Sequence, residues 1–214
     1  VLLTAALLGG CKSGDGFKFG NLDVASLVEG AKGLREIKEP EEIQIGNGVA
    51  ETLLGAAPLL DDAELQRYVN EVGMWVAQQS ERPGLPWQFG VNNSDHINAF
   101  AAPGGVIIVT KGMMAQLRNE AELAGVLGHE VAHVTRKHHL NALRKNAVMS
   151  LIGAGVSAAA AESKHADLVK KLVGPTKELY ARDLDKADEF EADRIGVVLA
   201  ARAGYDPFGL PTVL

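Results

Sequence analysis

Apolar residues recur at helical spacing in two stretches of the chain. The first stretch follows Asp61 and Asp62, and the second follows Asn119. The apolar positions are Leu65, Tyr68, Val69, Val72, Trp75 and Val76 in the first, and Leu123, Val126, Leu127, Val131 and Val134 in the second. Because residues three and four apart share one face of a helix, both stretches predict helices with one buried side. Asn119, with Glu122 three residues later, predicts an N-cap and a capping box.

Three short runs between these two helices predict strands. They span residues 87–91, 97–101 and 106–110. The intervening segments 92–95 and 103–105 contain the Asn, Asp, Ser, Pro and Gly residues that favour turns. The pattern therefore predicts an α+β fold that is mostly helical, with a small three-stranded sheet beside the second helix.

Composition narrows the classes of protein to which the chain can belong. Its 214 residues suit one domain, which we expect over residues 21–214, with enough core to fold alone. The formal net charge of −6 and the absence of a basic block argue against a nucleic-acid partner. Aromatic residues are scarce whereas alanine and glycine are plentiful, which favours closely packed helices over a β-sandwich. A single cysteine leaves no internal disulfide.

The predicted helix after Asn119 contains the sequence His129-Glu130-Val131-Ala132-His133. Side chains four positions apart differ by about 40° around a helix axis, so both imidazoles can reach one zinc ion. Glu130 lies about 100° further round, where it can contact a water molecule on the metal but is a poor ligand. This is the H-E-x-x-H pattern of zinc peptidases, with the glutamate as general base. A salt-bridged surface helix is the alternative, but the apolar stripe indicates buried histidines that need partners.

A catalytic zinc ion takes three protein ligands, so the third must come from elsewhere in the chain. The acidic segment 188–193 places Glu189 and Asp193 four residues apart on one helical face. We expect Glu189 to bind the metal and Asp193 to accept the second N–H of a ligating histidine, which fixes the ring orientation. Glu191 points about 200° away from Glu189 and is the poorer ligand. A solvated acidic helix face is the alternative.

Four segments occur in a fixed order: N-A-F-A-A-P-G-G at 98–105, H-E-V-A-H at 129–133, E-F-E-A-D at 189–193 and A-G-Y-D-P at 203–207. Together they resemble the HtpX and CAAX prenyl-protease type of gluzincin metallopeptidase, over roughly residues 60 to 214. The resemblance implies a zinc endopeptidase with one zinc ion per chain. It assigns His129, His133 and Glu189 as ligands, Glu130 as the base and Asp193 as the partner of a ligand. Because relatives continue beyond this point, we expect a further C-terminal segment.

The N-terminal residues suggest a bacterial sorting signal. Residues 1–10 are almost entirely apolar and predict the hydrophobic part of a signal peptide. Leu8-Gly9-Gly10-Cys11 resembles a lipobox, in which Cys11 becomes lipidated and residues 11–20 form a tether. By analogy with lipoprotein sorting, Lys12 favours the outer over the inner membrane. We therefore expect a periplasmic protein with a lipid anchor, the alternative being an incidental cysteine after an ordinary signal.

Four further segments predict helices. Residues 21–57 predict two short helices broken near Pro40, residues 111–117 one short helix, and the chain after Pro175 a long helix reaching about residue 203. Residues 147–161 are apolar and rich in small side chains. We expect them to form a helix beside the active site, since about 17–25 residues are needed to cross a bilayer. A membrane-inserted hairpin is the alternative.

The expected function is the cleavage of misfolded or misassembled envelope proteins. We predict that residues 97–101 form an edge strand beside the zinc ion, where Asn98, Ala99 and Phe100 hold an extended substrate by main-chain hydrogen bonds. His138 and His139 fall off the ligand face of a continuous helix, so we expect them to support the site or to lie on the surface. The alternative functions are an assembly factor or chaperone with repressed proteolysis, and a pseudoenzyme with a structural zinc. The presence of Glu130 argues against the pseudoenzyme.

Overall fold

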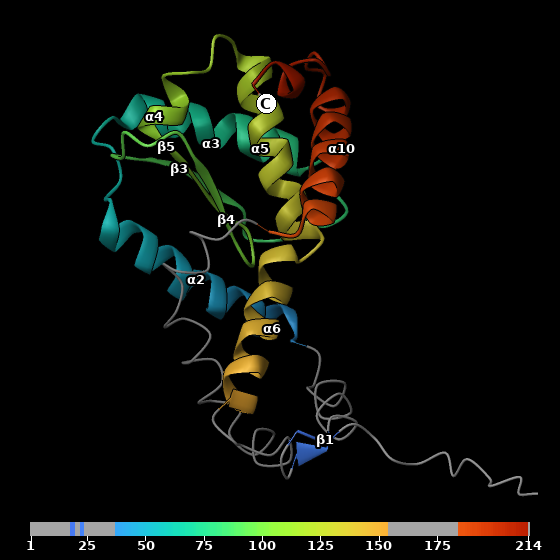
Figure 1. Ribbon diagram of the computed structural model, residues 1–214. Coiled ribbons are helices and arrows are strands. Elements are labelled where there is room, and N and C mark those ends of the chain that lie inside the picture. The colour runs from blue at the N-terminus through green and yellow to red at the C-terminus, as the bar shows by residue number, and fades with distance from the viewer. Residues whose placement is uncertain (1–17, 20–21, 24–36, 154–183, 214) are drawn as a thin grey trace, which may run out of the picture.

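The computed structural model describes residues 18–19, 22–23, 37–153 and 184–213 (Figure 1). The helices are α2 (Glu39–Ala56), α3 (Ala63–Ala77), α4 (Lys111–Met114), α5 (Glu120–Thr135), α6 (His138–Gly153) and α10 (Lys186–Arg202), followed by the 3-10 helix η1 (Leu210–Thr212). The strands are β1 (Lys18–Phe19), β2 (Leu22–Asp23), β3 (Gln88–Asn92), β4 (Ala99–Ala102) and β5 (Val106–Thr110). This arrangement of helices around a small sheet confirms the predicted α+β class.

The central sheet has three strands in the order β3-β5-β4. β5 runs parallel to β3 and antiparallel to β4, so the sheet is mixed and β4 lies at one edge. The predicted strands match the observed ones to within two residues. β1 and β2 form a separate antiparallel pair, and β1 belongs to the segment expected to be a tether.

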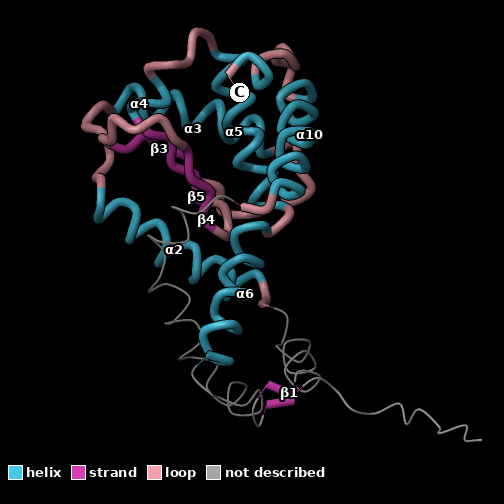
Figure 2. Tube along the Cα trace, in the orientation of Figure 1, coloured by secondary structure: helices cyan, strands magenta, loops and turns pink. Residues whose placement is uncertain are grey.

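Helices cover both sides of the central sheet (Figure 2). α3 and α5 lie on one side, α2 lies on the other, and α10 packs against α5. The larger apolar core joins α3, β3, β5, α5 and α10, with Val76, Val91, Leu127 and Val131 among its fully buried members. A smaller core of Ile45, Val49, Leu140 and Leu143 holds α6 against α2. The site described below lies where α5, α6 and α10 meet.

Most predicted helix boundaries agree with the structure, and the differences have local causes. Asn119 is an N-cap, as expected, and accepts from Glu122 N–H at 3.0 Å. Asp62 is the N-cap of α3 and accepts from Leu65 N–H at 3.0 Å. The second half of the expected capping box is wrong. The buried Glu122 carboxylate instead accepts from the N–H and Nε of Arg118, both at 2.8 Å, because the guanidinium supplies the charge that a buried carboxylate needs.

The structure agrees only in part with the other helices that the sequence predicts. α2 begins at Glu39 with Pro40 in its first turn, where its missing N–H costs no hydrogen bond, and the helix expected before it lies largely outside the described residues. α4 ends at Met114 rather than residue 117. α6 covers 147–153, but the rest of that small-residue stretch, and the chain from Pro175 to residue 183, lie outside the described residues. α10 begins at Lys186, after the extended Asp185, so the helix that contains Glu189 starts later than predicted. Within the described part of the chain, the helices are too short or too polar to span a bilayer.

The buried carboxylate of Glu42 holds neighbouring loop segments next to α2. Glu42 is fully buried, and its two oxygens accept from Arg82 Nη1 at 2.8 Å and Nη2 at 3.0 Å. It also accepts from Gly104 N–H at 3.3 Å, and Lys137 Nζ lies 3.6 Å away. Because Gly104 belongs to the β4–β5 turn and Lys137 links α5 to α6, this cluster holds both segments next to α2.

Candidate metal centre

Two glycines allow α5 and α10 to approach at backbone distance. A Cβ placed on Gly128 would lie 2.8 Å from Gly196 O, and one on Gly196 would lie 2.7 Å from His129 N. Side chains at these positions would therefore force the helices apart. The close crossing brings the acidic first turns of α10 alongside the histidines of α5.

The structure brings together the three side chains that the sequence predicts as metal ligands. Nε2 of His129 lies 2.9 Å from Nε2 of His133. The Glu189 carboxylate reaches both rings, with Oε2 at 3.5 Å from His129 Nε2 and Oε1 at 3.8 Å from His133 Nε2. Three such atoms within 4.8 Å of one another can hold a metal ion. Two imidazoles and one carboxylate are the donor set of His₂Glu zinc sites, so the residues fit this metal.

Asp193 orients the first histidine. Its Oδ1 lies 3.0 Å from Nδ1 of His129. The carboxylate can only accept, so His129 carries its hydrogen on Nδ1 and keeps the lone pair on Nε2. That lone pair faces the cluster, and the effect of Asp193 on metal binding stays a prediction.

A longer chain of hydrogen bonds orients the second histidine. Nδ1 of His133 lies 3.0 Å from Nδ1 of His138, whose Nε2 lies 3.3 Å from Glu191 Oε2. Because the carboxylate accepts, His138 carries its hydrogen on Nε2 and its Nδ1 accepts from His133 Nδ1–H. His133 is thereby left with its lone pair on Nε2, directed at His129 and Glu189. His138, at 4% exposed, therefore supports His133 and does not lie on the surface.

Burial and charge favour, for His133 and Glu189, the protonation states that a metal requires. Burial, together with the neighbouring histidines, lowers the pKa of His133 to about 2, so its ring is neutral. The hydrogen bond with His129 lowers the pKa of Glu189. Burial alone would lower the pKa of His129, but Glu189, Glu130 and Asp193 together raise it. A neutral imidazole and an ionised carboxylate are the forms that bind cations.

Glu130 lies beside the cluster without belonging to it. It is 8% exposed, and no described residue forms a hydrogen bond with its carboxylate. Burial raises its pKa to about 7, with His129 lowering the value and Glu189 raising it. A cation on the histidines would favour the carboxylate form and lower this pKa. A buried carboxylate that titrates near neutral pH and lacks a permanent partner suits a general base.

The segment predicted to bind substrate lies next to α5. Ala99 and Phe100 pair with Val109 and Ile108 of β5, and Asn98 precedes β4. The N–H of Asn98 donates to Thr110 Oγ1 at 3.0 Å. Ala99 and Phe100 therefore belong to β4, Asn98 directly precedes it, and the contact of all three residues with substrate stays a prediction.

The A-G-Y-D-P segment supports the start of α5. The Tyr205 hydroxyl donates to Glu120 Oε1 at 2.9 Å, and the Tyr68 hydroxyl donates to Oε2 at 3.1 Å. Burial and the Glu120 carboxylate raise the pKa of Tyr205 to about 12. Trp75 Nε1 donates to Ala203 O at 2.7 Å. These contacts fix the end of α10 against α3 and α5.

A helix with H-E-x-x-H, a glutamate from a second helix and a small mixed sheet together define the gluzincin class of metallopeptidase. The chain belongs to peptidase family M48, whose family model matches residues 61–214. This agrees with the resemblance seen in the four sequence motifs.

Relatives of known name are bacterial and mitochondrial. The chain is 33% identical over 181 residues to the beta-barrel assembly-enhancing protease of Escherichia coli (strain K12), covering 81% of this chain and 37% of that protein. It is 30% identical over 223 residues to the protein of the same name from Yersinia pestis, covering 100% of this chain and 46% of that protein. It is 33% identical over 159 residues to mitochondrial metalloendopeptidase OMA1 of Arabidopsis thaliana, covering 72% of this chain and 30% of that protein. The chain thus spans less than half the length of each of these relatives.

Proposed function

We propose that this chain is the catalytic domain of a zinc-dependent endopeptidase of the bacterial cell envelope. The observation that carries the proposal is the His129, His133 and Glu189 cluster, whose donor atoms lie within 4.8 Å of one another. The buried Glu130 beside it supplies the group that a purely structural site does not need.

His129, His133 and Glu189 would hold the zinc ion, with Asp193 and His138 fixing the two rings. When bound, zinc acts as a Lewis acid and lowers the pKa of a coordinated water toward about 7. Glu130 accepts the proton of the attacking water as the scissile carbonyl is converted to a tetrahedral centre. It then delivers that proton to the leaving amine. The buried surroundings of Glu130 favour its acceptance of the proton, because its protonated form is stable there.

We infer that the substrates are misfolded or misassembled envelope proteins. Main-chain hydrogen bonds to the start of β4 would hold an unfolded segment without demanding one sequence. Asn98, Ala99 and Phe100 are the residues assigned to this contact. The printed names of the bacterial relatives contain both "protease" and "assembly-enhancing". Those names support envelope proteolysis, and they also keep assembly or chaperoning as the second candidate function.

Metal analysis tests the proposed site. The purified chain should contain one zinc ion, and Glu189→Gln should lose most of it, because the variant replaces a ligating carboxylate by a neutral amide. Glu51→Gln, an exposed glutamate of α2, is the matched control and should keep its zinc. Full zinc content in Glu189→Gln would assign the third ligand to another residue.

We further propose that Cys11 carries the lipid anchor and places the domain in the periplasm, at the outer membrane. Cys11 lies outside the described residues, so this proposal depends on the Leu-Gly-Gly-Cys sequence. Cys11→Ser should release the protein from the membrane fraction. Mass spectrometry of the native protein that finds an unmodified Cys11 would remove the anchor.

A further inference from the structure

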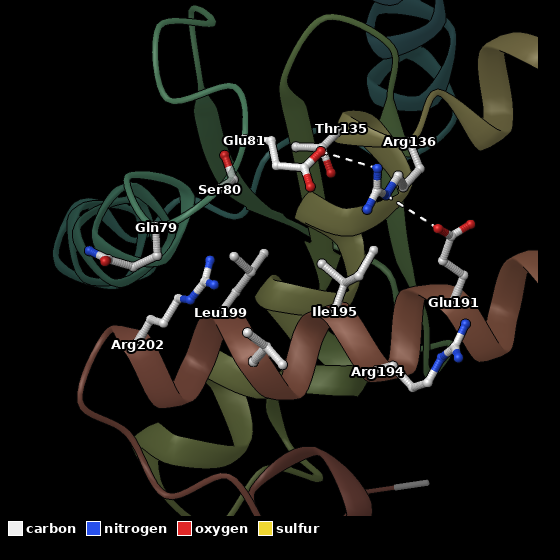
Figure 3. Close-up of a pocket in the computed structure, with 11 residues that line it drawn as sticks. Gln79, Ser80, Glu81, Thr135, Arg136, Glu191, Arg194, Ile195, Leu199 and Arg202 are labelled. Carbon is white, nitrogen blue, oxygen red and sulfur yellow. Dashed lines mark ion pairs between the residues drawn. The ribbon is translucent and has the colours of Figure 1, made fainter.

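A cavity that none of the predicted metal ligands lines lies beside α10 (Figure 3). It has a volume of about 380 Å³ and lies between α10, the end of α5 and the loop that follows α3. His129, His133 and Glu189 do not line it. The cavity is therefore open to a ligand that does not contact the metal ligands.

The α10 side of the cavity combines an apolar centre with two positive ends. Arg194, Val198 and Arg202 lie at positions i, i+4 and i+8, so they follow one face of the helix. Ile195 and Leu199 flank Val198, and Figure 3 shows them between the two arginines. A ligand that fits this side needs an apolar group in the middle and negative charge toward both ends.

The two arginines at the ends keep their charges available. The Nε–H of Arg194 donates to the carbonyl oxygen of Phe190 at 3.2 Å. This acceptor is neutral, so it does not balance the charge of the guanidinium. Neither Arg194 nor Arg202 forms an ion pair within residues 37–153 and 184–213. The third arginine, Arg136, differs, because it pairs with Glu81 at 3.1 Å and Glu191 at 3.3 Å. The unpaired positive charge of the cavity is thus concentrated on α10, in a chain whose net charge is −6.

We propose that this cavity binds an extended peptide segment with an apolar residue between two acidic ones. Eight residues of helix span about 12 Å, at about 1.5 Å per residue. Four residues of extended chain span about 13 Å, and side chains at i, i+2 and i+4 point to the same side. A segment of the form acidic-x-apolar-x-acidic therefore places its carboxylates near Arg194 and Arg202 and its apolar side chain over Val198. Carboxylate–guanidinium pairs of this kind are charge-assisted and directional.

The proposal goes beyond peptidase activity, since binding needs neither zinc nor Glu130. The probe is the peptide acetyl-Glu-Ser-Leu-Ser-Glu-Lys(rhodamine)-amide, and its binding to the full chain is measured by fluorescence anisotropy in the presence of a chelator. Binding should weaken at least about tenfold in Arg202→Glu, which replaces an attractive charge by a repulsive one. Arg194→Glu should have an effect of similar size, and Val198→Ser a smaller one.

Controls separate the site from general attraction to a charged surface. Arg67→Glu makes the same charge change on an exposed position of α3 and should leave affinity unchanged. A peptide with Lys in place of both Glu residues should not bind, and one with Ser in place of Leu should bind more weakly. Equal weakening by Arg67→Glu and Arg202→Glu, or equal binding of the Lys peptide, would overturn the proposal. Because zinc is absent from the assay, neither result bears on the metal centre.

Discussion

Two of the buried glutamates in the described part of this domain, Glu42 and Glu130, have surroundings that differ in kind. Glu42 is surrounded by positive and hydrogen-donating groups: Arg82 on both oxygens, the Gly104 N–H and Lys137. Glu130 is also buried, but no described residue donates to it, and burial raises its pKa to about 7. Both oxygens of the first carboxylate have donors within the fold. The second is left able to exchange a proton.

Burial of a carboxylate therefore does not reveal its role, whereas its partners do. A fully paired carboxylate such as Glu42 joins segments of the fold, because each donor belongs to a different loop or helix. A buried carboxylate without a donor is costly for folding unless it becomes protonated or meets a cation. Glu130 lies beside a cluster that can hold a cation, so its cost to folding is consistent with a functional role.

The largest effect expected from this comparison is on catalysis by Glu130→Gln. The variant removes the proton acceptor but no predicted ligand, so peptide cleavage should fall by about 10²–10⁴-fold while zinc content and fold are retained. Cleavage of a misfolded envelope protein and rescue of a deletion strain should be measured together. Loss of both would make proteolysis the function, and loss of cleavage with full rescue would favour assembly or chaperoning. Undiminished cleavage would contradict the mechanism.

Glu42→Gln should have the opposite profile, with a large loss of stability. Removing one partner of a buried ion pair costs about 3–5 kcal/mol, and we expect about 3 kcal/mol because Arg82 keeps 17% of its side chain exposed. Glu39→Gln is the matched control, since Glu39 also pairs with Arg82 but is 58% exposed, and it should cost less than about 1 kcal/mol. Urea unfolding measures both. Equal costs would mean that Glu42 does not tie the loops together.

Local periodicity predicts each half of the His129, His133 and Glu189 cluster, because it determines which side chains share a helical face. His129 and His133, and likewise Glu189 and Asp193, share a helical face wherever their helices lie. It does not reveal how α10 packs on α5, which depends on the close approach of Gly128 and Gly196. The motif order and the family resemblance supplied that pairing instead.

His138 shows where periodicity fails. A continuous helix would turn His138 away from the ligand face, and the sequence gives no sign that the helix ends. The structure breaks the helix at Lys137, whose φ of 60° is in the left-handed region. α6 then starts in a new direction and brings His138 to His133. Periodicity does not single out Glu42 either. Its partners Arg82, Gly104 and Lys137 lie 40 or more residues away from it in the sequence.

Smaller effects are expected for the side chains that hold the two histidines in place, which are Asp193 for His129 and the His138–Glu191 pair for His133. Asp193→Ala removes the only described acceptor of His129 Nδ1–H, so the ring loses its fixed tautomer. Zinc affinity should fall by about 10–100-fold, the usual effect of losing such a partner. Competition with a chromophoric chelator measures it. Asp206→Ala, on an exposed turn after α10, is the control and should bind zinc as the wild type does.

The smallest effect is expected at Glu191, which supports His133 only through His138. Glu191→Gln keeps an oxygen that can accept from His138 Nε2–H, so zinc affinity should fall by less than about tenfold. Glu191→Leu removes the acceptor and should weaken binding further, although it keeps the side-chain size. The d–d spectrum of the cobalt-substituted protein adds a readout of ligand orientation, and it should change in Glu191→Leu but not in Glu191→Gln. If both variants bind zinc with wild-type affinity and spectrum, the hydrogen-bond chain that runs from Glu191 through His138 to His133 does not position the ligand. His138 then contributes only packing.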